Sequence, residues 1–280
     1  MQITLLNRFL DDTAFISDSR GLLLVHLIYG PLDETRMAEH PHVTQLRTTL
    51  KPKMTLKDGI AHIPVQGVLA YNPDPYEMLY AGIEDSRSVL AMVSSAAEDS
   101  NVKGMLLDMD SPGGFSNGGF EIADAVAEAQ KVKPVISHIG GTGASLGYLI
   151  ASQAGTVIAN RSARVGSIGA YNMNIDRSRL AKNAGIEVEV FKNKEAKFKA
   201  MGLPGTSLSD EQKTHLKAQA QSSFDDFSAM VLAARPNVST DAMQGQVFSG
   251  QQAKANGLVD YVGDYSLATK TLKFQIDKRT

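Results

Sequence analysis

The sequence predicts an α/β protein built on a largely parallel sheet. Apolar, strand-like runs alternate with amphipathic helical stretches from residue 58 onwards, and short glycine-containing turns separate them. A strand, a helix and a second strand in succession form a right-handed crossover, which leaves the two strands parallel. Catalytic loops in such sheets gather at the carboxyl ends of the strands. Residues 111–114 and 143–145 follow two of the predicted strands, so both are candidate site positions.

Charge and composition exclude several classes of partner and chemistry. Lys and Arg number 28 and Asp and Glu number 30, a net charge of −2, which favours neither nucleic acid nor an anionic membrane as a partner. The chain has no cysteine, so disulfides, thiol catalysis and zinc–thiolate sites are excluded. The longest apolar run, residues 21–29, is too short for a membrane-spanning helix, which needs about 20 residues. We therefore expect a cytoplasmic protein with no membrane anchor.

Residues 1–55 are expected to be an N-terminal extension of unknown role, and residues 56–280 the functional domain. The extension has no clean periodicity and contains Pro31, Pro41 and Pro52, and its apolar run at 22–28 fits a strand or a short helix equally well. His40 and His42 flank a proline in a polar stretch with no third ligand, so we interpret them as loop histidines. No metal and no cofactor are expected.

The first half of the domain alternates between strands and helices. Residues 59–69 form a glycine-bounded strand, and residues 85–98 form a helix because Val89, Leu90, Val93 and Ala97 share one face. Residues 102–110 are mostly apolar, as in a strand covered on both faces, and they run into a Ser-Pro-Gly-Gly turn at 111–114. A helix at 119–130 and a strand at 133–139 complete this series.

The stretch 140–170 is the centre of the prediction. It reads as a strand end, a Gly/Ala turn that holds Ser145, a short helix at 146–154, a second strand and a Gly-Ser-Ile-Gly turn. Beyond it we predict a strand at 171–175, a helix at 177–183, a strand at 186–191 and a lysine-rich loop at 192–204. Ser209 and Gln212 have capping-box spacing and open a long helix that ends at Arg235 and Pro236. A short helix and an apolar strand follow within 247–260.

Ser145 is the candidate nucleophile. A serine between a strand and a helix lies beside amides that have no helical partner, although serine is also a favoured N-cap, so a purely structural role is the alternative. A hydroxyl nucleophile needs a base. We interpret His62 and His138 as strand histidines and His215 as a solvated helix residue, so no Ser-His-Asp set is predicted.

A lysine can replace histidine as the base when its amine is neutral. The lysine-rich loop offers Lys197 and Lys199, between which residue chemistry does not choose. Ser167, in the Gly-Ser-Ile-Gly turn, could hold the amine, or could be an ordinary turn serine. An oxyanion needs amide donors, for which Gly114 and Leu146 are candidates, with simple turn formation as the alternative reading of the glycine.

Several motifs together resemble those of the S49 peptidases, the signal peptide peptidase A-like serine proteases. The similarity covers roughly residues 58–262. The motifs are Ser111-Pro-Gly-Gly114, Ala144-Ser145-Leu-Gly-Tyr148, Val165-Gly-Ser-Ile-Gly169, Lys197-Phe-Lys199 before Gly202-Leu-Pro204, Val247-Phe-Ser-Gly-Gln-Gln-Ala253, and Gly257-Leu-Val-Asp260. The resemblance implies a ClpP/crotonase-like fold and a Ser-Lys dyad.

The resemblance also assigns roles to individual residues. Ser145 matches the nucleophile, and Lys199 matches the general base because the family's lysine follows an aromatic or similar residue. Ser167 matches the hydroxyl that binds the lysine, and Gly114 and Leu146 match the oxyanion donors. This chain has Ala196 where the family usually has glycine, which leaves Lys197 as the alternative base.

Within the family, the chain looks most like the phage and prophage head maturation proteases of the protein C-like branch. That branch implies a serine endopeptidase that cleaves scaffold or capsid precursors in the host cytoplasm or the prohead interior, and a homo-oligomer. The alternatives are a bacterial, cytoplasmic enzyme like signal peptide peptidase that degrades peptides, a crotonase-like acyl-CoA enzyme, and a non-catalytic capsid-assembly scaffold.

Overall fold

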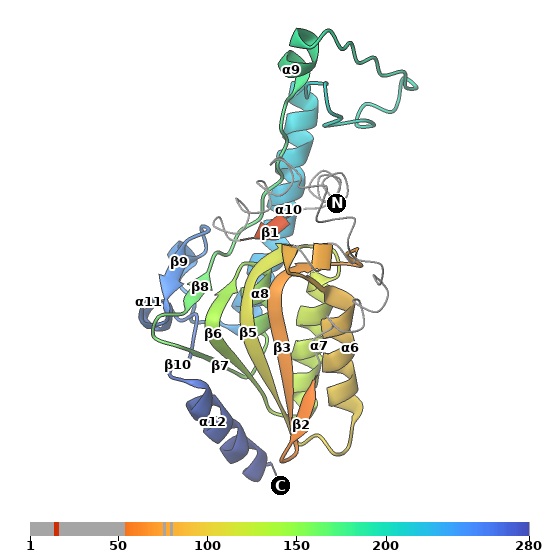
Figure 1. The fold of residues 1–280 in the computed structure, drawn as a ribbon. Helices are drawn as coiled ribbons and strands as arrows, with labels where there is room; N and C mark the ends of the chain where they lie inside the picture. The colour runs from red at the N-terminus through yellow and green to blue at the C-terminus, as the bar shows by residue number, and fades with distance from the viewer. Residues whose placement is uncertain (1–13, 17–53, 75–76, 79–80, 280) are drawn as a thin grey trace.

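A computed structural model describes residues 14–16, 54–74, 77–78 and 81–279 of the chain (Figure 1). The expectations for the apolar run at 22–28 and for His40 and His42 lie outside the described residues. Within the described part, no helix combines the length and the apolar character that a bilayer-spanning helix requires.

The described strands form one ten-stranded sheet with the main order β10-β7-β6-β5-β3-β2. The pairs β3·β4, β3·β5, β5·β6, β6·β7, β6·β8 and β7·β10 are parallel, whereas β1·β5, β2·β3 and β8·β9 are antiparallel. The predicted α/β class with a largely parallel sheet is therefore confirmed. The strands are β1 (Ala14–Ile16), β2 (Thr55–Lys57), β3 (Ile60–Ala70), β4 (Ile83–Asp85), β5 (Gly104–Phe115), β6 (Val135–Ala144), β7 (Thr156–Ala159), β8 (Arg164–Gly166), β9 (Val247–Ser249) and β10 (Tyr261–Val262).

Helices cover both faces of the sheet, which explains its apolar strands. The helices α6 (Ser86–Glu98), α7 (Gly119–Val132) and α8 (Leu146–Ser152) lie on one face, and α12 (Tyr265–Asp277) lies on the other (Figure 1). Ile60 packs in the cluster under α12, while the next residue, Ala61, packs in the main core on the opposite face. Because both faces are buried, the strands are apolar throughout and do not alternate with polar residues.

The long helix α10 (Asp210–Ala234) belongs only in part to the core. Its start has the predicted capping box, in which Ser209 Oγ accepts from the Gln212 N–H and the Gln212 side chain accepts from the Ser209 N–H. Near its end Phe227 and Val231 are fully buried, and the helix packs against α8. The shorter elements are α9 (Ser178–Asn183), the 3₁₀ helix η1 (Thr240–Ala242) and α11 (Gly250–Ala255).

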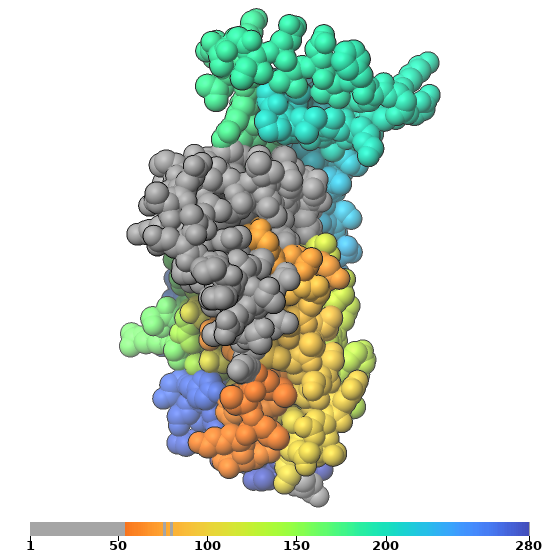
Figure 2. Space-filling model, turned by 45° about the vertical axis from the view of Figure 1, so that its right-hand side comes forward, coloured from red at the N-terminus to blue at the C-terminus, as the bar shows by residue number. Residues whose placement is uncertain are grey.

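Residues 175–212 form an arm that projects from the body together with the first half of α10. Figures 1 and 2 show α9 and the following loop standing away from the sheet at one end of the molecule. Nearly all side chains between residues 182 and 199 are exposed. The Lys197–Glu211 ion pair and a hydrogen bond from the Gln212 side chain to the Lys197 carbonyl hold the loop to the start of α10.

The expectations for four segments are wrong. Residues 171–175 and 186–191 do not form strands, because Tyr171 makes only an isolated bridge and no strand of the described residues pairs with the others. The Ser-Pro-Gly-Gly segment is not a turn but part of β5, where it pairs with β3 after a register shift. The glycines at 140–143 likewise continue β6, which pairs there with β5 and β8.

Candidate active site

Ser145 occupies a strained position between β6 and α8. Its backbone has φ 55° and ψ −125°, an unusual conformation for a residue that carries a side chain. Its side chain makes no capping hydrogen bond to α8, so the alternative reading as a simple N-cap is wrong. A strained serine at a sharp strand-to-helix turn is the arrangement known as a nucleophile elbow. The local geometry thus favours a chemical role for the hydroxyl.

Ser167 lies beside Ser145 at the end of the neighbouring parallel strand. Ala144 of β6 pairs with Gly166 of β8, and the Ser145 N–H donates to the Gly166 carbonyl over 2.7 Å. Ser167 also has a positive φ, 52°, and its N–H donates to the Gln246 carbonyl over 2.6 Å. Both serines are buried in the chain. The structure therefore brings these two predicted site residues together.

The two predicted oxyanion donors differ in their surroundings. Leu146 is the first residue of α8, where an N–H has no partner within the helix, and this N–H makes no hydrogen bond to the described residues. Gly114 lies inside β5, paired with Leu69 of β3 and with Phe15 of β1. A Cβ at Gly114 would lie 2.0 Å from the Leu69 carbonyl oxygen, so the glycine permits this close strand pairing. Its role as a donor stays a prediction.

The structure separates the two candidate lysines. Lys197 forms an ion pair with Glu211 over 3.1 Å, and its carbonyl accepts from the Gln212 side chain over 2.9 Å. No carboxylate of the described residues lies within ion-pair distance of Lys199, whose side chain is exposed. A base has to be uncharged before it accepts a proton, and a carboxylate partner stabilises the ammonium form. Lys199 is therefore the better candidate.

Lys199 and Ser145 do not meet within one chain. Lys199 belongs to the arm, which is tied to the start of α10 through Glu211, whereas α10 reaches the core at Phe227. These 16 residues of helix span about 24 Å at about 1.5 Å per residue. Figure 1 shows the same separation between the arm and α8. A single protomer thus holds Ser145 and Ser167 together and carries Lys199 away from them.

The three candidate histidines have other contacts. His138 Nε2 lies 3.3 Å from Asn160 Oδ1, and the His62 ring bonds Tyr265 Oη at 2.6 Å. Burial and the nearby Lys57 lower the pKa of His62. The His215 ring packs on Phe198, next to Lys199, with 4.5 Å between ring centroids. Sequence reasoning missed this contact and the contacts of Glu211 and Gln212 with Lys197, and helical spacing from the capping box is the signal that could have indicated them.

A groove of about 800 Å³ starts at Ser167 and continues along α10. One side consists of the chain after β8, the second of α10, and the third of the loop after η1. Its lining includes Ser167, Ile168, Gly169, Ala170, Tyr171, Asn172, Asn174, Lys213, Leu216, Lys217, Ala220, Gln221, Phe224, Met243, Gln244 and Gly245. The groove places a space large enough for a peptide segment next to the paired serines. No group of acidic and histidine side chains in the described part has an arrangement suited to a metal.

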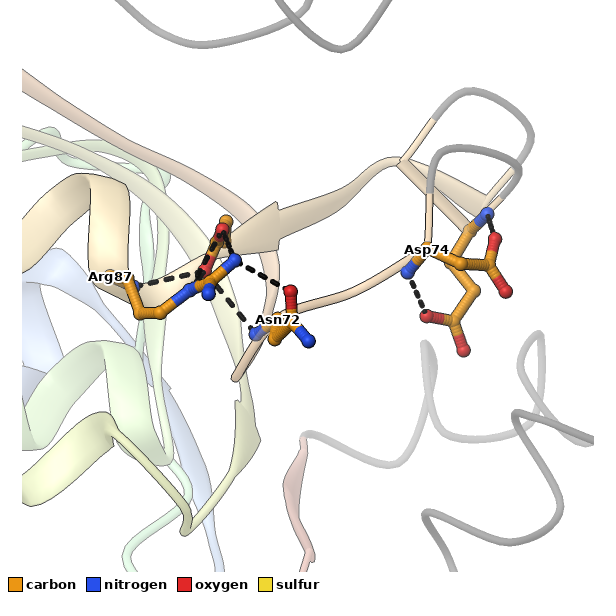
Figure 3. Close-up of polar contacts among 5 residues, drawn as sticks. Asn72, Asp74 and Arg87 are labelled. Atoms are coloured by element: carbon orange, nitrogen blue, oxygen red, sulfur yellow. Dashed lines mark hydrogen bonds and ion pairs between the residues drawn. The ribbon is translucent and has the colours of Figure 1, made fainter. Parts of the chain in front are cut away.

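A polar network fixes the chain beyond β3, the strand that flanks Gly114 (Figure 3). The Arg87 guanidinium donates to both Asp85 carboxylate oxygens at 2.8–3.2 Å and to Asn72 Oδ1 at 2.7 Å. Asp85 also caps α6 by accepting from the Arg87 N–H. Burial alone would raise the pKa of Asp85, but the hydrogen bonds from Arg87 outweigh it and hold this pKa below its ordinary value. Sequence reasoning placed the helix start here but missed the network.

A second network joins the candidate site to the end of the chain. The Tyr148 hydroxyl, one turn after Ser145 in α8, donates to the Leu258 carbonyl over 2.8 Å, and burial raises the pKa of this tyrosine. Arg235, at the end of α10, bonds Asp260 over 2.7 Å and the carbonyls of Ser152 and Ala154. Asp260 also accepts from the Val157 N–H over 2.7 Å. Leu258 and Asp260 of the Gly-Leu-Val-Asp motif therefore link this motif to α8, to β7 and to the end of α10.

Comparisons with known proteins identify the family of the chain. Residues 127–277 match Peptidase family S49. Capsid assembly protease C of Escherichia phage lambda is 29% identical over 79% of this chain and 50% of its own length. The putative signal peptide peptidase SppA of Enterococcus faecium is 29% identical over 78% of this chain and 65% of its own length. The chain thus spans about half to two thirds of the length of these relatives.

Among solved structures, a variant of the 1510-N membrane-bound stomatin-specific protease aligns with a TM-score of 0.46 and 14% identity, over 78% of this chain and 85% of that one. The matched family and the mainly parallel sheet agree with the ClpP/crotonase-like fold class expected from the motifs. Because the family match covers residues 127–277, which include Ser145, Ser167 and Lys199, the chain belongs to peptidase family S49.

Proposed function

We propose that this protein is a serine endopeptidase in which Ser145 is the nucleophile and Lys199 of a second copy is the general base. The observation that carries the proposal is the backbone strain at Ser145, whose side chain does not cap α8. Ser145 lies beside Ser167, where the groove begins, and the chain belongs to family S49. No cofactor takes part in the proposed reaction.

In the proposed reaction Ser145 Oγ attacks a peptide carbonyl while the neutral Lys199 amine accepts its proton. The tetrahedral oxyanion forms beside the Leu146 N–H, with the Gly114 N–H as the second expected donor. Lys199 then gives the proton to the leaving amine, and a water molecule, activated in the same way, releases the acyl group from Ser145. The Ser167 hydroxyl, next to Ser145, would hold the amine in position.

The need for a second copy follows from the position of the arm. The arm that carries Lys199 is tied to α10 at Glu211, which lies about 24 Å along the helix from the buried Phe227, given the helical rise per residue. An exposed lysine that has no carboxylate partner among the described residues is available to a neighbouring protomer. The expected homo-oligomer would therefore complete the active site as well as enclose it.

For the substrate, we propose scaffold or capsid precursor proteins in the host cytoplasm or prohead interior. A relative supports this choice, because it is the capsid assembly protease C of phage lambda. The Enterococcus faecium relative, named a putative signal peptide peptidase, supports the alternative of bacterial peptide turnover. We also keep the division into an extension at 1–55 and a peptidase domain at 56–280 as a proposal.

A fluorophosphonate probe tests the nucleophile directly, because it reacts with an activated serine. We expect the wild type to be labelled and Ser145→Ala to lose labelling. Ser152→Ala is the matched control, since Ser152 is a buried serine of the same α8 helix whose hydroxyl bonds the Leu149 carbonyl. Equal labelling of the wild type and Ser145→Ala would contradict the assignment, and would favour a crotonase-like enzyme that does not need Ser145.

Co-expression with candidate capsid and scaffold proteins tests the substrate. We expect the wild type, but not Ser145→Ala, to shorten a precursor, as measured by its mass. An unchanged precursor with an enzyme that the probe does label would support peptide turnover. An unchanged precursor with an unlabelled enzyme would support the non-catalytic scaffold.

A further inference from the structure

The short strand β1 lies on β5 at the glycine that is expected to bind the oxyanion. β1 is antiparallel to β5, with Phe15 opposite Gly114 and Ile16 opposite Gly113. A strand has two edges, and β3 occupies one of them here, because it pairs with the same two glycines. β1 therefore holds the other edge of β5, which is the edge that faces β6.

β1 takes the place in the sheet that β6 leaves at the nucleophile. β6 pairs with β5 as far as Gly143, which lies opposite Ser111, and the chain then turns out of the sheet at Ser145 to begin α8. Ser145 is two residues beyond Gly143, and Gly113 is two residues beyond Ser111, so the parallel strands bring Ser145 and Gly113 to about the same level. Figure 1 shows β1, in red, at this end of the sheet.

The direction of β1 is that of a peptide about to reach Ser145. Because β1 is antiparallel to β5, its chain runs from the level of Phe115 back to that of Gly113, towards the end of β6. In the proposed reaction the attacked carbonyl lies between the N–H groups of Leu146 and Gly114. A peptide in that position extends along the same edge of β5, as an added strand does. β1 and such a peptide therefore exclude each other.

The groove and β1 lie on opposite sides of β6. Gly143 of β6 pairs with β5 on one edge and with β8 on the other, and the groove starts at Ser167, directly after β8. A substrate in the groove still needs the β5 edge, because the expected donor Gly114 belongs to β5. β1 thus leaves the groove open and blocks only the part of the substrate path that runs along β5.

The contact of β1 with the sheet is small enough to be reversible. β1 has three residues and pairs with no described strand except β5, whereas β5 and β6 have 12 and 10 residues. A short strand with a single partner makes few hydrogen bonds, so it opens locally at a small free-energy cost. Because β1 belongs to the same chain, it nevertheless has a high effective concentration at the β5 edge.

We infer that β1 is a built-in competitor of the substrate, which covers the β5 edge beside Ser145 until a protein substrate displaces it. The inference deepens the proposed function and rests on it for the roles of Ser145 and Gly114. A competitor of this kind lowers the apparent affinity for substrate in proportion to the time for which the edge is covered. It leaves the rate of the bound substrate unchanged, so its effect appears in KM and not in kcat.

Proline substitution in the full chain tests the competitor by its kinetics. Ala14→Pro with Phe15→Pro removes the N–H groups of two successive residues, one of which points towards β5 in a strand. We expect this variant to lower KM for dye-labelled casein about tenfold and to leave kcat unchanged. Ala14→Val with Phe15→Leu keeps both N–H groups and the preference for a strand, so this matched control should have the KM of the wild type.

A binding measurement tests the same contact without catalysis. In a Ser145→Ala background, a dye-labelled peptide with the sequence of residues 11–18, Asp-Asp-Thr-Ala-Phe-Ile-Ser-Asp, should bind the proline variant at least tenfold more tightly than the chain with its natural β1. Fluorescence anisotropy measures the affinity, and a peptide of scrambled sequence is the control. Hydrogen exchange at residues 113–115 should be faster in the proline variant and should slow again when the peptide is added.

An unchanged KM in the proline variant, or equal affinity of the two chains for the peptide, would overturn the inference. So would the loss of residues 1–16 from the purified wild type but not from Ser145→Ala, as measured by intact mass, because β1 would then be a substrate and not a competitor. Tighter peptide binding by the proline variant, with no fluorophosphonate labelling of any chain that has Ser145, would support the competitor and reject the catalytic proposal alone.

Discussion

Ser145 and Ser167 lie side by side at the ends of two parallel strands, linked by the 2.7 Å hydrogen bond from the Ser145 N–H to the carbonyl of Gly166. Both have a positive φ, 55° and 52°, which is uncommon for residues with side chains. The fold therefore holds the backbones of these two serines next to each other.

If Ser167 positions the base, its loss should slow the reaction without removing the nucleophile. We expect Ser167→Ala to lower kcat by about tenfold to hundredfold through misplacement of the amine. Peptide cleavage assays measure the rate, and the exposed Ser162→Ala is the control. Unchanged kcat in Ser167→Ala would show that this hydroxyl has no part in the chemistry.

The two lysines of the arm should respond differently to replacement. Lys199→Ala should reduce kcat by about hundredfold or more, as expected for loss of a general base. Lys197→Ala should retain most of the activity, because Lys197 pairs with Glu211. Cleavage rates of the two variants check both statements, and the reverse ranking would reassign the base to Lys197.

The Arg235–Asp260 pair should contribute to stability more than to catalysis. Arg235 is 8% exposed and bonds Asp260, Ser152 and Ala154. Arg235→Met leaves the carbonyls of Ser152 and Ala154 without their donor, whereas the partly exposed Asp260 carboxylate is solvated by water, so we expect a loss of about 1–3 kcal/mol in the free energy of unfolding. Urea denaturation measures the loss, with the exposed Arg161→Met as the control. A change similar to that of the control would show that the pair adds little.

The Asp85–Arg87 contact should make stability depend on pH. Because the pKa of Asp85 is lowered in the folded chain, its contribution is full above the unfolded value, about 3.9, and is lost as pH falls through the lower folded value. Arg87→Ala should thus destabilise the protein at neutral pH, and the difference from the wild type should shrink below about pH 4. Urea denaturation at several pH values tests this. A difference that stays constant with pH would mean that the carboxylate is not involved.

Much of the fold could be predicted from sequence, because local patterns and tertiary structure agree over most of the body. The capping box at Ser209 and Gln212 and the strand-turn-helix around Ser145 are examples. Helix α12 was not predicted, although Asp264 as its cap and the buried Ala268, Leu272 and Ile276 at four-residue spacing gave the signal.

The predicted strand at 186–191 fails for a different reason. Its composition is correct for a strand, but a strand needs a partner, and the described residues supply none. For the same reason the sequence could indicate Ser145, Ser167 and Lys199 but not their relative positions. The placement of Lys199 depends on the length of α10 and on the direction of the arm, which arise only from the packed structure.

Subunit complementation tests the central claim most directly. Ser145→Ala and Lys199→Ala chains are each expected to be inactive, and co-expression should restore activity at sites that combine an intact Ser145 from one chain with an intact Lys199 from another. With random mixing this amounts to about a quarter of the sites in a symmetric oligomer. Recovery near that level is the predicted result. Activity no higher than that of the two variants measured separately, in oligomers shown to contain both chains, would contradict an active site shared between copies.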